Sequence, residues 1–216
     1  MILLTAATPW ERRPLEKTGL EVLETGIGPA KAREALDAWR GRASVVVSSG
    51  FAGALQPGIF CGDILFDPLE SPVALAQGAR ETAEELGIPL HMGRIQSVDR
   101  VLESPDDKRR LAAQVRAAAV DMETAAVRDW ARSRGVTPLG VRVILDGLDD
   151  RLPRGLPKGD SLAAGVRYAF SRPAEIPFLI GLGLRQRRAI AVLVRFLEAY
   201  APRIPSFLER SHAEEA

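Results

Sequence analysis

The chain has 216 residues, 46% of them hydrophobic and 26% charged, as is typical of a globular protein with one large domain and at most a small appendage. Its 29 basic and 28 acidic residues give a net charge of +1, which makes no electrostatic case for nucleic acid as a partner. One cysteine and two histidines exclude a disulfide framework, a cysteine zinc site and a histidine-rich metal centre. We therefore expect no metal or other cofactor and, in an enzyme, chemistry that rests on carboxylates.

The sequence shows neither a secretory signal nor a membrane span. Residues 1–9 lack a basic start followed by a long apolar core. No stretch reaches the roughly 18 uninterrupted apolar residues that a spanning helix needs. We expect a cytoplasmic protein.

Strands and helices alternate through the first two thirds of the chain. Short apolar or β-branched runs predict buried strands, and apolar residues spaced three and four apart predict helices. In chain order, the expected elements are strands 2–7 and 20–25, helix 30–40, strands 44–49 and 62–66, helix 73–86, strand 90–97, helix 105–115, strand 117–121, helix 122–133 and strand 138–145. This alternation predicts an α/β fold with three layers, α/β/α, around a mixed, mostly parallel central sheet.

The pattern changes in the last third of the chain. Residues 147–160 are rich in glycine, proline and charged side chains, which predicts a loop. A helix is expected at 161–170, and a long amphipathic helix at 178–200. We expect one domain over residues 1–170 and a C-terminal helical extension over residues 171–216, packed on that same domain.

Several chemically notable residues fall where predicted strands end. Glu11 follows the first strand, Gly26–Gly28 the second, Ser49–Gly53 the third and Asp146 the last, while Glu123 lies at a helix start. Ligands of open parallel sheets bind at the carboxyl ends of the strands, so the pattern predicts a site there. A tight turn, a loop cap or a solvated surface charge would also explain each group taken alone.

Four segments, taken together and in this order, resemble the nucleoside phosphorylase and nucleosidase superfamily. They are 25–30 (TGIGPA), 49–55 (SGFAGAL) with 62–64 (GDI), 119–126 (AVDMETAA) and 142–146 (RVILD), of which the VDMETAA piece is the most specific. Within the superfamily, segments 97–123 and 171–188 most resemble the hopanoid-associated phosphorylase-like group. The futalosine hydrolases and the methylthioadenosine nucleosidases are similar as well.

The resemblance implies cleavage of the N-glycosidic bond of a purine nucleoside through an oxocarbenium-like transition state. Asp146, at the end of the R-x-x-x-D segment, would protonate the purine at N7. Glu11 matches the position of the glutamate that orients the attacking water in the hydrolases of the superfamily. We therefore expect Asp146 and Glu11 to be the catalytic residues.

The resemblance also implies a set of residues that bind the substrate. Glu123 would hold the ribose hydroxyls, Met122 would pack on the sugar, and Val101 and Leu102 would cover the base. The matching segments add three further expected binding residues, which are Phe51, Gly53 and Arg142.

The choice between water and phosphate as the nucleophile depends on two departures from the phosphorylase pattern. Phosphorylases of the superfamily place an arginine three residues before a phosphate-contacting serine, and here these positions are Ser48 and Phe51. A phosphate dianion without a nearby cation would be poorly held, so we favour hydrolysis. Arg12, Arg13 or an arginine of a partner subunit could replace that cation, which leaves phosphate open as a nucleophile. A phosphate-dependent phosphorylase is the alternative, and a nucleoside-binding protein without turnover is a second one.

The hopanoid-associated group implies a nucleoside that carries a large apolar substituent at the 5′ position. We expect the helix at 178–200 to pack on the sheet or at a subunit interface, and its arginines leave contact with a membrane surface as an alternative. Members of the superfamily assemble as dimers or hexamers, so we expect a homo-oligomer. The expected partners are therefore a nucleoside, further copies of this chain and, in the alternative function, phosphate.

Overall fold

The computed structural model describes residues 1–68, 70–152 and 176–214. Most of the predicted loop at 147–160 and the whole predicted helix at 161–170 lie outside the described residues. The described strands are β1 (Ile2–Ala6), β2 (Glu21–Glu24), β3 (Val45–Ala54), β4 (Ile64–Asp67), β5 (Leu90–Met92), β6 (Ile95–Ser97), β7 (Ala119–Asp121) and β8 (Thr137–Asp146). The described α-helices are α1 (Pro9–Leu15), α2 (Pro29–Ala38), α3 (Val73–Leu86), α4 (Pro105–Gln114), α5 (Thr124–Ser133), α7 (Ile176–Tyr200) and α8 (Ile204–Glu214).

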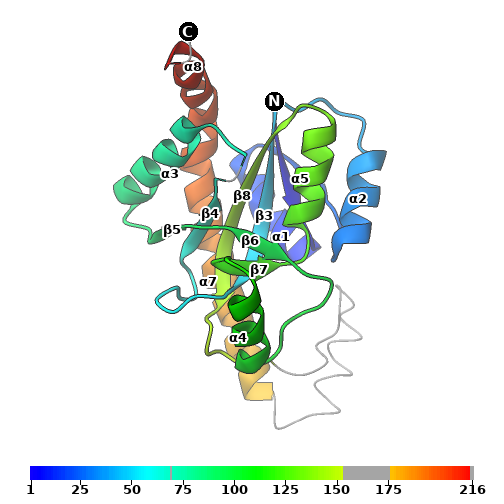
Figure 1. Cartoon of the computed structure of the whole chain (residues 1–216), viewed down its shortest axis with the longest axis vertical. Coiled ribbons are helices and arrows are strands. Elements are labelled where there is room, and N and C mark those ends of the chain that lie inside the picture. The colour runs from blue at the N-terminus through cyan, green and yellow to red at the C-terminus, as the bar shows by residue number, and fades with distance from the viewer. Residues whose placement is uncertain (69, 153–175, 215–216) are drawn as a thin grey trace.

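The strands form one mixed sheet in the order β2-β1-β3-β8-β4-β5, and β7 joins it through the end of β3 and in turn pairs with β6. Strands β2, β1, β3 and β8 are parallel, whereas β4 runs antiparallel to β8. Helices cover both faces of the sheet (Figure 1). The predicted α/β fold with a mixed, mostly parallel sheet is therefore confirmed.

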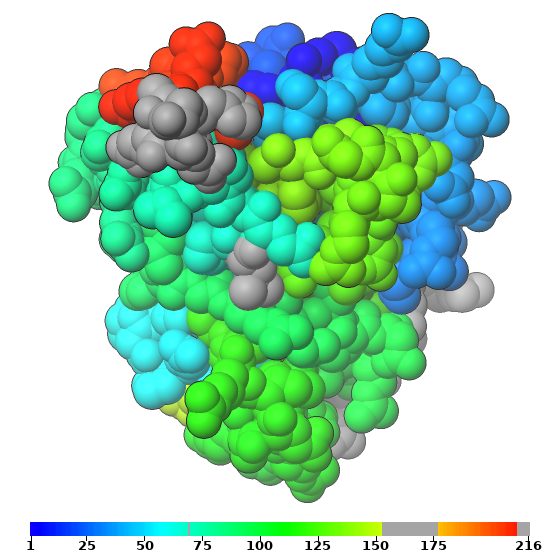
Figure 2. All heavy atoms as spheres, turned by 45° about the horizontal axis from the view of Figure 1, so that its top comes forward, coloured from blue at the N-terminus to red at the C-terminus, as the bar shows by residue number. Residues whose placement is uncertain are grey.

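Alternating side chains of the central strands supply two apolar layers, one on each face of the sheet. Leu3 and Val46 face a cluster with α2 and α5, whereas Leu4 and Val47 face the larger cluster with α3 and α7. This is the period-two pattern of strands buried on both faces. Helices α2 and α5 lie side by side on the surface of the first face, and the segment from β6 to α4 forms the other end of that surface (Figure 2).

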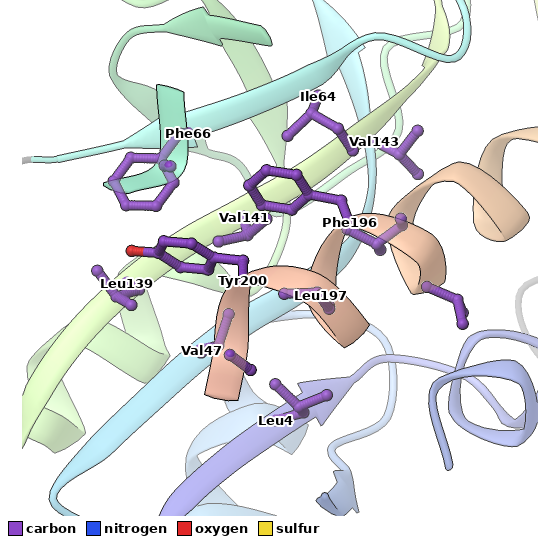
Figure 3. Close-up of a cluster of buried hydrophobic side chains, with 14 of the residues drawn as sticks. Leu4, Val47, Ile64, Phe66, Leu139, Val141, Val143, Phe196, Leu197 and Tyr200 are labelled. Atoms are coloured by element: carbon purple, nitrogen blue, oxygen red, sulfur yellow. The ribbon is translucent and has the colours of Figure 1, made fainter. Parts of the chain in front are cut away.

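Helix α7 is the main helix of the larger layer. Its C-terminal half points Phe196, Leu197 and Tyr200 into the strands, and all three side chains are fully buried (Figure 3). The Tyr200 ring meets the Phe66 ring edge to face with 5.8 Å between centroids, and its hydroxyl donates a 2.9 Å hydrogen bond to the Leu75 carbonyl. Replacing such a buried aromatic side chain with alanine costs about 3–5 kcal/mol.

The structure differs from the sequence expectations in four places. The expected strand 90–97 is divided into β5 and β6, which pair with β4 and β7, respectively. The sequence predicts that β3 ends at residue 49, with Ser49–Gly53 at and beyond that end. In the structure β3 continues to Ala54, so Ser49–Gly53 lie inside the strand. Helix α1 was not expected, because seven residues with an internal proline carry too little periodicity. Helix α8 was not expected either; it packs against α3, where the Phe207 ring lies so close to Gly78 that any larger residue would clash.

Candidate active site

A cavity of about 880 Å³ lies at the carboxyl ends of β1, β3 and β8. The parallel register of these strands brings their ends to one edge of the sheet, and α4 and the first turns of α7 lie beyond the same edge (Figure 1). Four buried carboxylates line this cavity, at 4–6% exposure each: Glu11, Asp121, Glu123 and Asp146. The carboxyl-end site that the sequence predicts therefore coincides with a real cavity.

Glu11 is held in place by the start of its own helix. Its Oε2 accepts hydrogen bonds from the backbone N–H and the hydroxyl of Thr8, each at 3.0 Å, in a capping box at the N-terminus of α1. Its Oε1 accepts a 2.9 Å bond from the backbone N–H of Phe51. Burial raises the pKa of Glu11, while the charge of Arg142 and these hydrogen bonds oppose the shift.

Two glycines of β3 let the strand approach these carboxylates closely. Gly50 has a φ of +127°, and a side chain there would overlap Glu11 Oε1. A Cβ on Gly53 would lie 3.1 Å from Asp146 Oδ2, tighter than an ordinary contact. The glycines of the SGFAGAL segment therefore make room for the protein's own acidic groups.

Glu123 follows β7 and is bound by the glycine turn after β2. The backbone N–H of Gly28, which has a φ of +95°, donates a 2.8 Å hydrogen bond to Glu123 Oε1. This glycine turn therefore binds the carboxylate of Glu123, an anionic group of the protein itself. Burial raises the pKa of Glu123 to about 7; Asp121 and Glu11 add to this shift, whereas Arg142 and the Gly28 bond oppose it.

Arg142 lies beneath the cavity, with its guanidinium among buried polar groups and an exposure of only 1%. Its Nη2 pairs with Asp121 Oδ2 at 2.5 Å, bonds to Ser48 Oγ at 2.8 Å and lies 3.7 Å from Glu123 Oε2. Arg142 does not itself line the cavity but contacts Asp121 and Glu123, which do; its predicted contact with substrate stays a prediction. One cation offsets part of the repulsion among the buried carboxylates.

Asp146 ends β8 and meets a lysine that the sequence did not single out. The Lys108 ammonium, on α4, forms an ion pair with Asp146 Oδ2. Burial raises the pKa of Asp146, and Lys108 opposes that shift through its charge and its hydrogen bond. No sequence signal marks Lys108, because the segment 105–110 (PDDKRR) has the composition of an ordinary charged surface helix.

The remaining lining is mostly apolar and includes five of the predicted binding residues, Phe51, Gly53, Val101, Leu102 and Met122. Helix α7 adds a wall that no motif predicted, and α1 adds part of the rim. The side chains of this wall and rim are Trp10, Pro14, Ile180, Leu182, Leu184 and Ile190. The cavity therefore has a carboxylate-bearing end at the sheet and a largely apolar end at α7 and the rim of α1, where Arg13, Gln186 and Arg187 also line it.

Neither a metal site nor a membrane-spanning helix is present in the described residues. No group of three or more histidine, cysteine, aspartate or glutamate side chains is arranged to hold a metal ion in the part of the chain that the structure describes. Among those same residues, no helix has the length and apolar character to cross a bilayer.

Residues 65–162 match the model of the phosphorylase superfamily. Among solved structures, futalosine hydrolase of Helicobacter pylori (a mutant) is 19% identical with a TM-score of 0.69, over 94% of this chain and 98% of that chain. An Asp→Asn mutant of the H. pylori 5′-methylthioadenosine/S-adenosylhomocysteine nucleosidase, with 5′-methylthioadenosine in its active site, is 18% identical with a TM-score of 0.69, over 94% and 98% of the two chains.

The corresponding nucleosidase of Streptococcus pneumoniae, with a transition-state inhibitor, is 20% identical with a TM-score of 0.64, over 92% of this chain and 98% of that chain. No curated protein sequence matches the chain significantly. These comparisons confirm the resemblance to the nucleoside phosphorylase and nucleosidase superfamily and support the prediction of an enzyme.

Proposed function

We propose that the protein hydrolyses the N-glycosidic bond of a purine nucleoside. One observation carries the proposal: Glu11, Glu123 and Asp146 line a single cavity at the sheet edge as buried carboxylates from separate elements, and the fourth buried carboxylate of the lining, Asp121, is paired with Arg142. Burial raises the pKa of each of them, as suits groups that exchange or share protons during a reaction. The neighbouring folds are those of enzymes named for cleavage of nucleosides.

Asp146 is the proposed acid. It donates a proton to N7 of the purine while the bond between C1′ and N9 breaks, so the base leaves as a neutral molecule. A carboxyl group performs this step only while it carries a proton, and the burial of Asp146 favours that form. The sugar gains oxocarbenium character as the base departs.

Glu11 and Glu123 act on the sugar side. Glu123 accepts hydrogen bonds from ribose hydroxyls, and these bonds strengthen as positive charge develops on the ring. Glu11 orients a water molecule toward C1′ and takes one of its protons as the new C–O bond forms. Two carboxyl groups, one at the leaving group and one at the water, are the arrangement of inverting glycoside hydrolases.

The surroundings of the phosphorylase positions favour water over phosphate. Ser48 is buried and its hydroxyl is already bonded to Arg142 and Thr124. Phe51 places an apolar side chain on the lining where the phosphorylases have a serine. Neither position therefore offers a phosphate the cation and hydroxyl of the phosphorylase pattern.

The apolar end of the cavity supports a nucleoside with an apolar 5′ substituent. Ile180, Leu182 and Leu184 of α7 and Trp10 of α1 would pack along such a group. Removing this apolar surface from water would contribute about 25 cal/mol per Å² to binding. The proposed substrate class is thus a 5′-substituted adenosine-type nucleoside.

An end-point assay on a nucleoside panel, with and without phosphate, tests the proposal. The panel contains adenosine, inosine, methylthioadenosine, S-adenosylhomocysteine, futalosine and a 5′-alkyl adenosine, and chromatography separates base from sugar product. We expect free base and free sugar independent of phosphate, with the highest kcat/KM for the 5′-alkyl adenosine. Ribose 1-phosphate would show a phosphorylase instead, and binding of adenine without release of base from any substrate would show a binding protein.

A further inference from the structure

Lys108 is an unusual residue in this structure because its ammonium group is almost fully buried, at 1% exposure. Its Nζ forms the ion pair with Asp146 Oδ2 and also donates to the carbonyl oxygens of Gly147, at 2.6 Å, and Asp150, at 3.2 Å. An ammonium group has three donors, and here all three have an acceptor. The amino group of Lys108 is therefore fully hydrogen-bonded at this site.

Burying an ammonium group has a large desolvation cost. The link between α4 and the segment after β8 does not depend on it, because a backbone contact already makes that link. The backbone N–H of Leu152 donates a 2.9 Å bond to the Glu103 carbonyl, which ties the segment after Asp146 to the approach to α4. Both Lys108 and Asp146 line the cavity. The ion pair thus lies at the site of the proposed chemistry, and not in a remote part of the core.

From this placement we infer that Lys108 is a positioning residue for Asp146: it orients the carboxyl group toward the cavity and neutralises the carboxylate that remains after proton transfer to the base. The inference rests on the proposed function. When Asp146 gives its proton to N7, a negative charge appears in a buried site. The Lys108 ammonium, fixed by Gly147 and Asp150, is already in place to stabilise that charge without rearrangement.

Charged groups from several elements surround Asp146. Lys108 approaches from α4, Asp150 from the segment after β8, and Arg185 from α7, where its Nη1 lies 3.9 Å from Asp150 Oδ2. Asp150 and Arg185 carry opposite charges and act on Asp146 in opposite directions. Lys108 is the cation in direct contact with Asp146, so its loss should move the titration of Asp146 to higher pH.

The test compares Lys108→Gln and Lys108→Met with the wild type and with Lys17→Met, a control on an exposed surface lysine. Gln keeps a hydrogen-bond donor for the Gly147 and Asp150 carbonyls, so that variant should remain folded. Thermal unfolding measures whether each variant is folded. We expect a loss in kcat of about 100-fold with little change in KM, and an alkaline limb of the pH–rate profile that moves upward. Lys17→Met should match the wild type.

A double variant separates action through Asp146 from a general structural role. In an Asp146→Asn background the acid is absent, so Lys108→Gln should lower the residual rate less than twofold. Equal fractional losses in both backgrounds, with an unmoved alkaline limb, would overturn the inference.

Infrared titration of the Asp146 carboxyl band, identified by its absence in Asp146→Asn, gives a readout that needs no turnover. The midpoint should rise in Lys108→Gln, and an unchanged midpoint refutes the inference whether or not the protein cleaves nucleosides. A shifted midpoint in a protein that releases no base refutes the proposed function while the Lys108–Asp146 coupling stands.

Discussion

Asp146 experiences two opposed influences: burial favours its neutral form, and the Lys108 ammonium favours its ionised form. An acid that must donate and then recover its proton at neutral pH needs such a balance, because either influence alone would fix one protonation state. The proposed mechanism therefore requires that Asp146 carry an acidic proton, and not merely that a side chain of its size be present.

Asp146→Asn tests this directly. The amide keeps the size of the side chain but has no acidic proton, so we expect kcat to fall by about 100-fold or more with KM within a few-fold of wild type. Steady-state kinetics on the best substrate of the panel measure both. A riboside whose leaving group needs no proton serves as the control and should keep most of its rate; near-full activity on the purine nucleoside would contradict the role of Asp146.

Glu123 gives a prediction for stability. Its pKa is about 7 in the folded protein and near 4.5 in the unfolded chain, so the folded state binds the proton more tightly. Folding stability from this group is fully present below pH 4.5 and is lost as pH rises through about 7, by roughly 3 kcal/mol for such a shift.

Urea unfolding of Glu123→Gln between pH 4.5 and 8 measures this effect. We expect the variant to lose less stability than the wild type over that range, while the exposed Glu34→Gln should follow the wild type. Glu11 and Asp146 remain in all three proteins and contribute in the same direction, so some loss persists in the variant. Parallel curves for Glu123→Gln and wild type would show that Glu123 does not titrate as described.

The capping box of α1 links a short helix to the orientation of Glu11. The Thr8 hydroxyl accepts from the Glu11 N–H and donates to the Glu11 carboxylate, so one side chain both starts the helix and aims the carboxylate. Helix α1 also packs on β1 and α7, which holds this short element in place.

Thr8→Val should therefore impair activity more than stability. Loss of the cap costs about 1 kcal/mol of unfolding free energy, whereas misorientation of Glu11 should lower kcat at least tenfold. Urea unfolding and steady-state kinetics measure the two effects, and Thr8→Ser, which keeps the hydroxyl, is the control. A kcat equal to wild type in Thr8→Val would mean that the hydroxyl does not position Glu11.

The sequence predicted the long elements well because their apolar spacing reflects burial against the sheet. Strand β8 and helices α2, α3 and α7 lie close to their expected positions. The end of β3 was missed because Gly50 and Gly53 suggest a loop, whereas here they admit the Glu11 and Asp146 side chains to a strand that continues. These glycines are explained by contacts with Glu11 and Asp146, which are distant in sequence, so the sequence around β3 alone does not reveal them.

In the candidate site, too, the sequence predicted some residues and missed those whose role depends on tertiary contacts. The motifs pointed to Glu11, Glu123 and Asp146, which the structure brings to one cavity. The sequence pattern did not point to Lys108 or to the apolar wall of α7, because neither a lone lysine nor an amphipathic helix indicates which cavity it will face. Their part in the site follows from tertiary packing alone.

On the scale of the molecule, the cavity mouth carries exposed apolar side chains. Trp10, Ile180 and Leu184 are 66%, 61% and 51% exposed and line the cavity. Exposed apolar side chains grouped at one place mark surfaces that associate. We propose that another copy of this chain covers this mouth.

Light scattering is the measurement for that proposal. We expect a mass of at least twice 23.4 kDa, and a reduced mass for the double variant Ile180→Ser/Leu184→Ser, in which two apolar side chains of the mouth become polar. Val73→Ser, at an exposed apolar residue on α3, is the control. A monomeric wild type would contradict the proposal, and pelleting with anionic liposomes that the double variant loses would assign the mouth to a membrane surface.

The two halves of helix α7 have different environments. The second half is buried against the strands, and the first half lies along the apolar end of the cavity. The proposed reacting groups come from other elements, at the ends of β1, β7 and β8. If the proposed function holds, substitutions in the first turns of α7 should therefore alter which nucleosides are accepted while the chemistry and the fold are retained. An inhibitor that extends along these turns would contact side chains that lie apart from the proposed reacting groups.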